Sequence, residues 1–178
     1  MGQVDILVNN AGTATSNPLS RIKLTEWEHI MAVNATGTFL CTQAMMKGMV
    51  ERGWGRIVNV ASIAGLEGGK YISAYTAAKH AVIGFTRSIA AEAEGTGVTV
   101  NAVCPGYVDT PLTDETVARI MQRTGKSWHE AMAAILEVSG QPRLIRAEEV
   151  AEEVMTLCSA GADEMTGELV ILDGKDTP

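Results

Sequence analysis

The chain has 178 residues, with 46% hydrophobic and 20% charged side chains, which is ordinary for one globular domain with a sizeable core. The net charge of −7, with scattered lysine and arginine, argues against nucleic acid or an anionic membrane as a partner. Cys41, Cys104 and Cys158 fit no disulfide framework, and we expect reduced core cysteines in a cytoplasmic protein. The sequence has no metal-ligand spacing, no signal peptide and no long apolar run.

The first elements are a buried strand and a long helix. Residues 4–9 have the pattern of a buried strand, and the turn at residues 10–12 follows. A helix is predicted from Thr25 to about Glu51, with Thr25 opening a capping box. Asn34 lies inside this helix, although asparagine favours caps and turns. Its position indicates a bend or a functional hydrogen bond, and the alternative is an exposed polar site.

The next strand and helix carry three polar side chains that can converge. A strand is predicted at residues 56–61, and Ser62 follows at its carboxyl end. The alanine-rich helix predicted from Ser73 to about Glu94 places Tyr75 and Lys79 one turn apart on the same face. Ser73 is the expected cap of this helix. Open α/β sheets bind ligands at the carboxyl ends of their strands, so these residues form a candidate catalytic site.

A phenol needs assistance to exchange protons at neutral pH, because its ordinary pKa is about 10. An ammonium about 4 Å away contributes about 4 kcal/mol at an effective dielectric near 20, which offsets about three pKa units. Lys79 could therefore lower the pKa of Tyr75, and Ser62 could donate a hydrogen bond to a substrate carbonyl. The structural alternative is a half-buried core tyrosine, a loop-capping serine and a solvated lysine.

The remaining elements continue the alternation of strand and helix. A strand at residues 98–104 ends at Pro105-Gly106, and the segment from Leu112 to Ile145 has the weakest pattern. Further elements are two short helices at residues 113–121 and 128–136, a helix at residues 146–160 and a strand at residues 169–172. The sequence contains no linker and no internal repeat. We therefore expect a single domain over residues 1–178, of the α/β class.

Taken together, these motifs resemble the short-chain dehydrogenase/reductase family. The resemblance covers essentially the whole chain and rests on the spacing of Ser62, Tyr75 and Lys79, together with Asn9-Asn10-Ala11-Gly12, Asn34 and Pro105-Gly106. It implies a doubly wound, Rossmann-like parallel sheet. It also implies that Tyr75 is the general acid/base, that Lys79 lowers its pKa, that Ser62 orients the carbonyl and that Asn34 holds a water.

The same resemblance implies an NAD or NADP cofactor. The residues expected to bind it are Asn10, Ala11, Gly12, Tyr75, Lys79, Pro105, Gly106, Val108 and Thr110. In this family the segment between Leu112 and Ile145 covers the substrate, so it should be mobile without ligand.

Part of the family pattern is missing. Members carry a glycine-rich turn near the amino end that binds the pyrophosphate, and no G-x-G-x-x-G motif occurs in this chain. The sequence therefore predicts only the carboxyl-terminal part of the doubly wound sheet. One hypothesis is an oxidoreductase, or the catalytic portion of one. The other is a non-catalytic remnant that acts as an oligomerisation or interaction module.

The resemblance also bears on the substrate and on assembly. By resemblance, the 3-hydroxybutyrate dehydrogenases of the family should bind a free carboxylate through a histidine and a lysine. Ala64 and Ile72 occupy those places here, which favours a neutral ketone or secondary alcohol, such as a 3-oxoacyl thioester. Small side chains on the helix at residues 73–94 and the apolar face of the helix at residues 146–160 predict a homo-oligomer, a dimer or tetramer as in the family.

Overall fold

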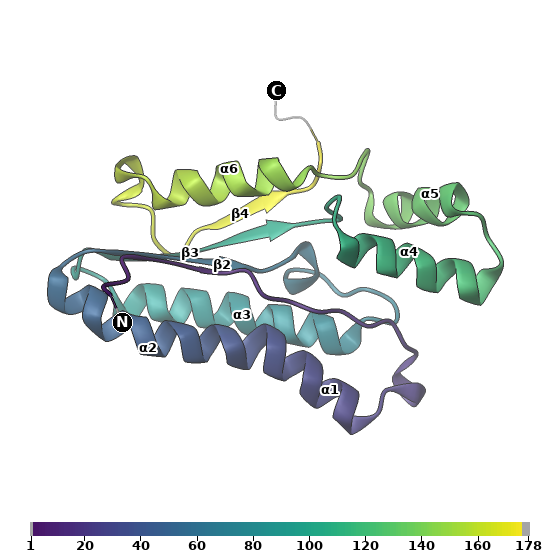
Figure 1. The fold of residues 1–178 in the computed structure, drawn as a ribbon, viewed down its shortest axis with the longest axis horizontal. Helices are drawn as coiled ribbons and strands as arrows, with labels where there is room; N and C mark the ends of the chain where they lie inside the picture. The colour runs from purple at the N-terminus through teal and green to yellow at the C-terminus, as the bar shows by residue number, and fades with distance from the viewer. Residues whose placement is uncertain (1, 176–178) are drawn as a thin grey trace.

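The computed structural model describes residues 2–175 and contains one four-stranded parallel sheet. Its strand order is β1-β2-β3-β4, so neighbours in space are also neighbours among the strands of the sequence (Figure 1). The strands are β1 (Ile6–Asn9), β2 (Gly55–Val60), β3 (Val98–Pro105) and β4 (Leu169–Leu172). Parallel strands in one layer bring all four carboxyl ends to the same edge of the sheet.

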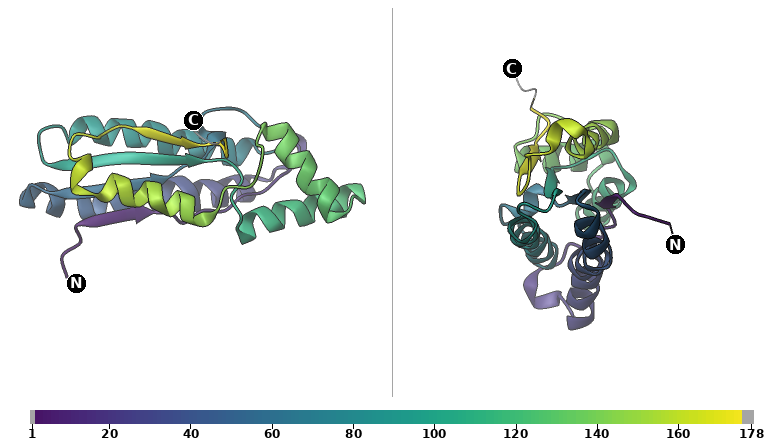
Figure 2. Two further views of the ribbon diagram at one scale, coloured as in Figure 1. Left: turned by 90° about the horizontal axis from the view of Figure 1, so that it is seen from above. Right: turned by 90° about the vertical axis from the view of Figure 1, so that its left-hand side faces the viewer.

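Helices cover both faces of the sheet. Figures 1 and 2 show α6 on one face, α1, α2 and α3 on the other, and α4 and α5 beyond the carboxyl ends of the strands. The α-helices are α1 (Leu24–Met31), α2 (Gly37–Arg52), α3 (Ser73–Glu92), α4 (Pro111–Thr124), α5 (Trp128–Ser139) and α6 (Ala147–Cys158). The short helical elements are η1 (Leu19–Arg21), η2 (Ala32–Thr36), η3 (Ile63–Gly65) and η4 (Ala160–Ala162). This layering confirms the predicted α/β class.

The core consists of two apolar layers, one on each face of the central strands. On one face Ile57 and Val100 pack with Met49 of α2. On the other face Val58 and Val103 contact Leu157 of α6. Strands β2 and β3 are buried on both faces, which explains their nearly continuous apolar sequences.

Two predicted helix caps are wrong. Helix α1 begins at Leu24 with Lys23 as its N-cap, so Thr25 is a helical residue and opens no capping box. Helix α3 begins at Ser73 itself, and its N-cap is Ile72. The remaining boundaries differ from the predicted ones by a few residues, since the ends of helices and strands depend on local contacts that periodicity does not encode.

The long helix predicted from Thr25 is interrupted where Asn34 lies. Residues 32–36 form the π-helical turn η2 between α1 and α2. Single π turns inside α-helices frequently occur at functional sites. The regular α-helix is therefore interrupted where the sequence predicted a bend or a functional hydrogen bond, and the alternative of an exposed polar site is wrong because Asn34 is buried.

Strand β1 lies at an edge of the sheet and is only partly covered. Within residues 2–175, β1 pairs with β2 alone, and its Ile6 and Val8 side chains are 46% and 40% exposed.

Cys41 is exposed, so the prediction of three core cysteines is wrong for this residue. None of the helices in the described part of the chain is both long and apolar enough to span a membrane.

Candidate active site

The predicted catalytic residues come together at the carboxyl edge of the sheet. Ser62 lies two residues after the end of β2, and α3 carries Tyr75 and Lys79 on the face toward this edge. The strand arrangement explains the convergence, because β2 and β3 end side by side in parallel register. Pro105 closes β3 at this edge and is buried.

Lys79 is the most deeply buried charged group of the cluster. Lys79 is 4% exposed, and its Nζ donates a hydrogen bond to the carbonyl oxygen of Val60 at 2.8 Å. Burial lowers the pKa of Lys79 from 10.5 to about 8, and the neighbouring Cys104 thiol opposes part of that shift. An ammonium with this pKa can lose its proton near the physiological range.

Tyr75 interacts with Ser62 and lies near Lys79, but its pKa is shifted in the direction opposite to the predicted one. The Lys79 Nζ is 5.7 Å from the centre of the Tyr75 ring. Burial raises the pKa of Tyr75, a hydrogen bond with Ser62 lowers it, and Tyr107 raises it further. Desolvation of the phenol therefore raises the pKa of Tyr75, whereas the sequence had predicted that the charge of Lys79 would lower it.

The Ser62 hydroxyl is also fixed by the main chain. It accepts a hydrogen bond from the amide of Ala64 at 3.1 Å and donates one to the carbonyl oxygen of Pro105 at 3.4 Å. These contacts join the ends of β2 and β3 through one side chain. They hold the hydroxyl beside the phenol with no histidine base, in agreement with a hydrogen-bonding role rather than a nucleophilic one.

Asn34 is buried and ties η2 to the loop after β1. Its Nδ2 donates to the carbonyl oxygens of Thr13 and Ile30, both at 2.9 Å, and its Oδ1 accepts from the Thr13 amide at 3.3 Å. A Cβ at Gly12 would lie 3.1 Å from the Asn34 Oδ1 and 3.7 Å from the Lys79 Nζ. Glycine at this position therefore leaves open the space between Asn34 and Lys79.

The residues expected to bind the cofactor occupy two segments of the same edge. Asn10, Ala11 and Gly12 are exposed directly after β1, while Val108 and Thr110 are half-buried beyond β3. The open space at Gly12 and the buried ammonium of Lys79 fit the nicotinamide and ribose end of a dinucleotide. A glycine-rich pyrophosphate turn is not encoded in the sequence.

The sequence-based reasoning missed Tyr107. This half-buried phenol follows the Pro105-Gly106 turn and contributes to the electrostatic environment of Tyr75. Burial raises the pKa of Tyr107 as well. The available signal was its place immediately after a strand-ending turn, at the edge where the catalytic residues converge.

Helices α4 and α5 cover the region beyond this edge. They share an apolar cluster that includes Val117 and Ile135, and Tyr107 packs against it. At the far end of α4, the Arg123 guanidinium donates to the side-chain oxygen of Asn17 at 2.8 Å. Mobility of this segment in the absence of ligand stays a prediction.

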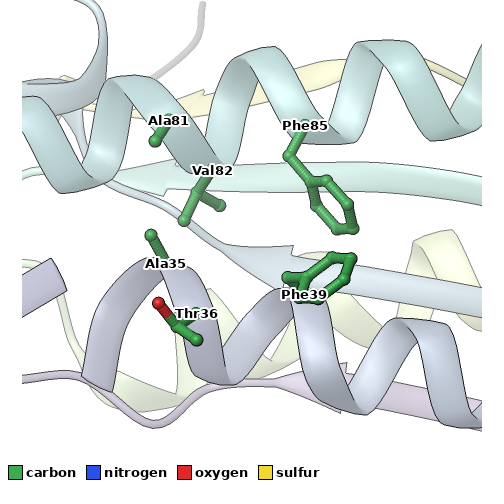
Figure 3. A pocket seen from close by; sticks show the side chains of 6 residues that line it. All are labelled: Ala35, Thr36, Phe39, Ala81, Val82 and Phe85. Carbon is green, nitrogen blue, oxygen red and sulfur yellow. The ribbon is translucent and has the colours of Figure 1, made fainter. Parts of the chain in front are cut away.

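An apolar groove lies away from these residues. It is formed between α2 and α3, where Phe39 and Phe85 face one another with ring centres 6.1 Å apart (Figure 3). Residues 2–175 contain no cluster of three or more histidine, cysteine or acidic side chains placed to hold a metal ion. The candidate chemistry therefore rests on the polar cluster at the carboxyl edge.

Comparison with known proteins identifies the family of the chain. The family model described as short chain dehydrogenase matches residues 1–121. The chain is 37% identical over 175 residues to a D-beta-hydroxybutyrate dehydrogenase of Rhizobium meliloti, covering 97% of this chain and 67% of the relative. It is 40% identical over 171 residues to a 3-oxoacyl-[acyl-carrier-protein] reductase of Aquifex aeolicus, covering 96% and 64%. The chain thus spans about two thirds of the length of these relatives.

Solved structures give the same result at the level of the fold. A variant of actinorhodin polyketide ketoreductase with NADPH matches with a TM-score of 0.89 and 37% identity, over 97% of this chain and 67% of that one. A putative 2-deoxy-D-gluconate 3-dehydrogenase from Agrobacterium tumefaciens with bound NADP matches with a TM-score of 0.84 and 36% identity, over 96% and 66%. With the family model covering most of the chain, the protein belongs to the short-chain dehydrogenase/reductase family of NAD(P)-dependent oxidoreductases.

Proposed function

We propose that the chain is the catalytic portion of an oxidoreductase that interconverts a ketone and a secondary alcohol. The observation that carries this proposal is the convergence of Tyr75, Ser62 and the buried Lys79 at the carboxyl edge of the sheet. A phenol that has a hydroxyl and an ammonium near it can exchange a proton with a substrate oxygen.

In the direction of reduction, Tyr75 transfers its phenolic proton to the carbonyl oxygen of the substrate. Ser62 donates a hydrogen bond to the same oxygen and so stabilises the charge that develops there. Lys79 stabilises the phenolate left on Tyr75, and its own lowered pKa lets it return a proton to that phenolate. In the direction of oxidation the same groups act in reverse, and Tyr75 removes the hydroxyl proton.

Lys79 and the segment Asn10–Gly12 would hold the nicotinamide end of an NAD or NADP cofactor. Pro105, Gly106, Val108 and Thr110 are proposed to bind the same end from the side of β3. When bound, this cofactor supplies or accepts the hydride. Asn34 would keep the loop at Thr13 in place and hold the water proposed from the family resemblance.

The favoured substrate is a 3-oxoacyl or 3-hydroxyacyl thioester, or another neutral ketone or alcohol. The half-buried Ala64 and Ile72 border Ser62 and the start of α3, and neither can pair with a carboxylate. Relatives named as acyl-carrier-protein reductases and as hydroxybutyrate dehydrogenases match almost equally well. The preference for a neutral substrate therefore rests on the lack of a partner for a carboxylate at Ala64 and Ile72.

A second candidate function is a non-catalytic interaction module. The exposed Ile6 and Val8 on β1 favour it, because a hydrophobic strand edge readily pairs with another chain. We further propose a homo-oligomer, a dimer or tetramer, built on α3 and α6. The groove beside α3, lined by Ala35 of η2 and Ala81 of α3, presents small side chains that permit close approach of a partner helix (Figure 3).

One comparison separates the two functions. The 178-residue chain and a fusion of it to the pyrophosphate-binding segment of a relative are assayed for NAD(H) and NADP(H) binding by calorimetry and for thioester reduction. We expect no measurable binding by the chain alone, and both binding and turnover by the fusion. A fusion that binds cofactor without turnover would support the interaction module, and micromolar binding by the chain alone would reveal a phosphate site elsewhere.

A further inference from the structure

The end of β3 is joined to the connection between α5 and α6 by a series of main-chain hydrogen bonds. The amide of Ile145 donates to the carbonyl oxygen of Tyr107 at 3.0 Å, and the amide of Asp109 donates to the carbonyl oxygen of Ile145 at 2.8 Å. Val108 and Ile145 form an isolated parallel bridge. The segment 141–145 therefore lies beside the residues that follow β3.

Gln141 adds a side chain to this junction. It is only 5% exposed, and its Oε1 accepts a hydrogen bond from the Tyr107 amide at 2.7 Å. Its Nε2 donates to the carbonyl oxygens of Tyr107 at 3.1 Å and Arg143 at 3.0 Å. One carboxamide thus holds both main-chain polar groups of Tyr107.

Gly106 is needed for this arrangement. A Cβ at Gly106 would lie 2.2 Å from the Oε1 and 2.8 Å from the Cδ of Gln141, distances that no side chain can adopt. The glycine is thus explained by the approach of Gln141, whatever part it takes in binding a cofactor.

Tyr107 carries the effect of Gln141 into the active site. Its phenol raises the pKa of Tyr75, and its ring packs against the apolar cluster of α4 and α5. Tyr107 also lies two residues beyond Pro105, whose carbonyl oxygen accepts the hydrogen bond of Ser62 at 3.4 Å. The orientation of the Tyr107 main chain therefore determines where the Tyr107 phenol lies relative to Tyr75, the proposed proton donor.

We propose that Gln141 is a positioning residue that fixes Tyr107 beside Tyr75 on the substrate side of the active site. This proposal rests on the proposed function for its consequence in catalysis, but its structural content concerns the ligand-free chain. The alternative is that the Gln141 carboxamide only anchors the segment 141–145 to the residues after β3 and does not affect the positions of the Tyr75 and Tyr107 phenols.

The chain suits a direct test, because it contains only three tyrosines. Tyrosine labelled with ¹³C at Cζ reports each phenol by NMR, and hydrogen exchange reports the amide of Tyr107. Gln141→Met retains the length of the side chain and removes its hydrogen bonds. Gln122→Met, at an exposed glutamine of α4, is the matched control.

In Gln141→Met we expect the Tyr107 amide to exchange about tenfold faster, as the loss of one hydrogen bond implies. The titration midpoints of both Tyr75 and Tyr107 should shift. Gly106→Ala should produce the same signature, because a Cβ displaces Gln141. Gln122→Met should leave the titration midpoints of Tyr75 and Tyr107 unchanged.

Unchanged titration midpoints of Tyr75 and Tyr107 in Gln141→Met would mean that Gln141 only anchors the segment 141–145, and would overturn the proposal. Equal acceleration of all amides would do the same, since it would indicate general destabilisation. If both variants fail to fold, Tyr107→Phe still decides, because it keeps the main-chain contacts to Gln141 and should lower the titration midpoint of Tyr75. An unchanged midpoint would mean that Tyr107 does not stand beside Tyr75 and would overturn the proposal. These measurements need neither cofactor nor turnover, so their failure is distinct from failure of the proposed function.

Discussion

The Nζ of Lys79 donates a hydrogen bond to the carbonyl oxygen of Val60 at 2.8 Å while lying 5.7 Å from the centre of the Tyr75 ring. A single ammonium therefore connects the end of β2 with the proposed proton donor on α3. Because Lys79 is 4% exposed, the charge is held where water solvates it poorly, and its pKa falls to about 8.

This buried lysine should give the chain a measurable pH dependence of stability. The pKa of Lys79 is about 8 in the folded chain against 10.5 ordinarily, so the native state binds fewer protons than the unfolded state between these values. The free energy of unfolding attributable to Lys79 therefore rises with pH in this window, by roughly 3 kcal/mol in total. Urea unfolding at pH 7.5 and pH 9.5 measures the rise.

Lys79→Met provides the comparison for that measurement. It lacks the titrating amine, so its free energy of unfolding should rise less between the two pH values. The raised pKa of Tyr75 reduces stability only at higher pH and is common to both proteins. Parallel stability profiles for the two proteins would show that the pKa of Lys79 is not lowered.

Tyr75→Phe should abolish turnover in the fusion described above. Only the oxygen that transfers the proton is lost, so affinity for the cofactor should remain nearly unchanged. General acid catalysis is worth roughly 100-fold or more, which makes kcat the decisive measurement. Retention of more than about a tenth of kcat would refute the role of Tyr75.

The fold could be predicted from the sequence where the pattern is strong. The apolar runs of β2 and β3 and the turns that end them fixed the parallel α/β class, and the one-turn spacing of Tyr75 and Lys79 brought both to one face of α3. The cap of α1 was not predictable in this way. Thr25 satisfies the capping-box pattern, yet the helix begins one residue earlier, because the chain enters it in extended conformation at Lys23.

Interactions between distant segments explain what the sequence-based reasoning missed. Gln141 contacts Tyr107 across 34 positions, and no local periodicity marks either residue. The direction of the Tyr75 pKa shift depends on burial, which a count of neighbouring charges omits. The mid-helix Asn34 was recognisable only because asparagine is disfavoured there.

Asn34→Leu should destabilise the chain by roughly 2–4 kcal/mol, because the carbonyl oxygens of Thr13 and Ile30 and the Thr13 amide lose a buried partner. Urea unfolding gives the change in free energy. Gln43→Leu, at an exposed position on α2, is the control and should have little effect. A similar small effect in both variants would mean that Asn34 does not secure the loop after β1.

The substrate prediction depends on charge at two positions. With Ala64 and Ile72 beside the proposed site, kcat/KM of the fusion should be higher for an acetoacetyl thioester than for free acetoacetate. Ile72→Lys should narrow that preference by supplying a partner for the carboxylate. A much higher kcat/KM of the unaltered fusion for the free acid would overturn the assignment of a neutral substrate.

The uncovered strand β1 predicts self-association of the 178-residue chain. Its Ile6 and Val8 side chains are 46% and 40% exposed, and within the described residues only one side of the strand is paired. Hydrophobic strand edges of this kind recruit further strands. We expect light scattering to show either assemblies larger than a tetramer or a complex with an added strand.

A charge on the strand should oppose this association. Val8→Lys places an ammonium among the exposed apolar side chains of β1, and burying that charge in a contact is costly, so the average mass should fall. Val138→Lys changes an 86% exposed valine at the end of α5, away from the sheet, and should leave the mass unchanged. Equal effects of the two substitutions would indicate general surface hydrophobicity instead of strand pairing. A monodisperse monomer of the unaltered chain would contradict both the strand pairing at β1 and the proposed homo-oligomer.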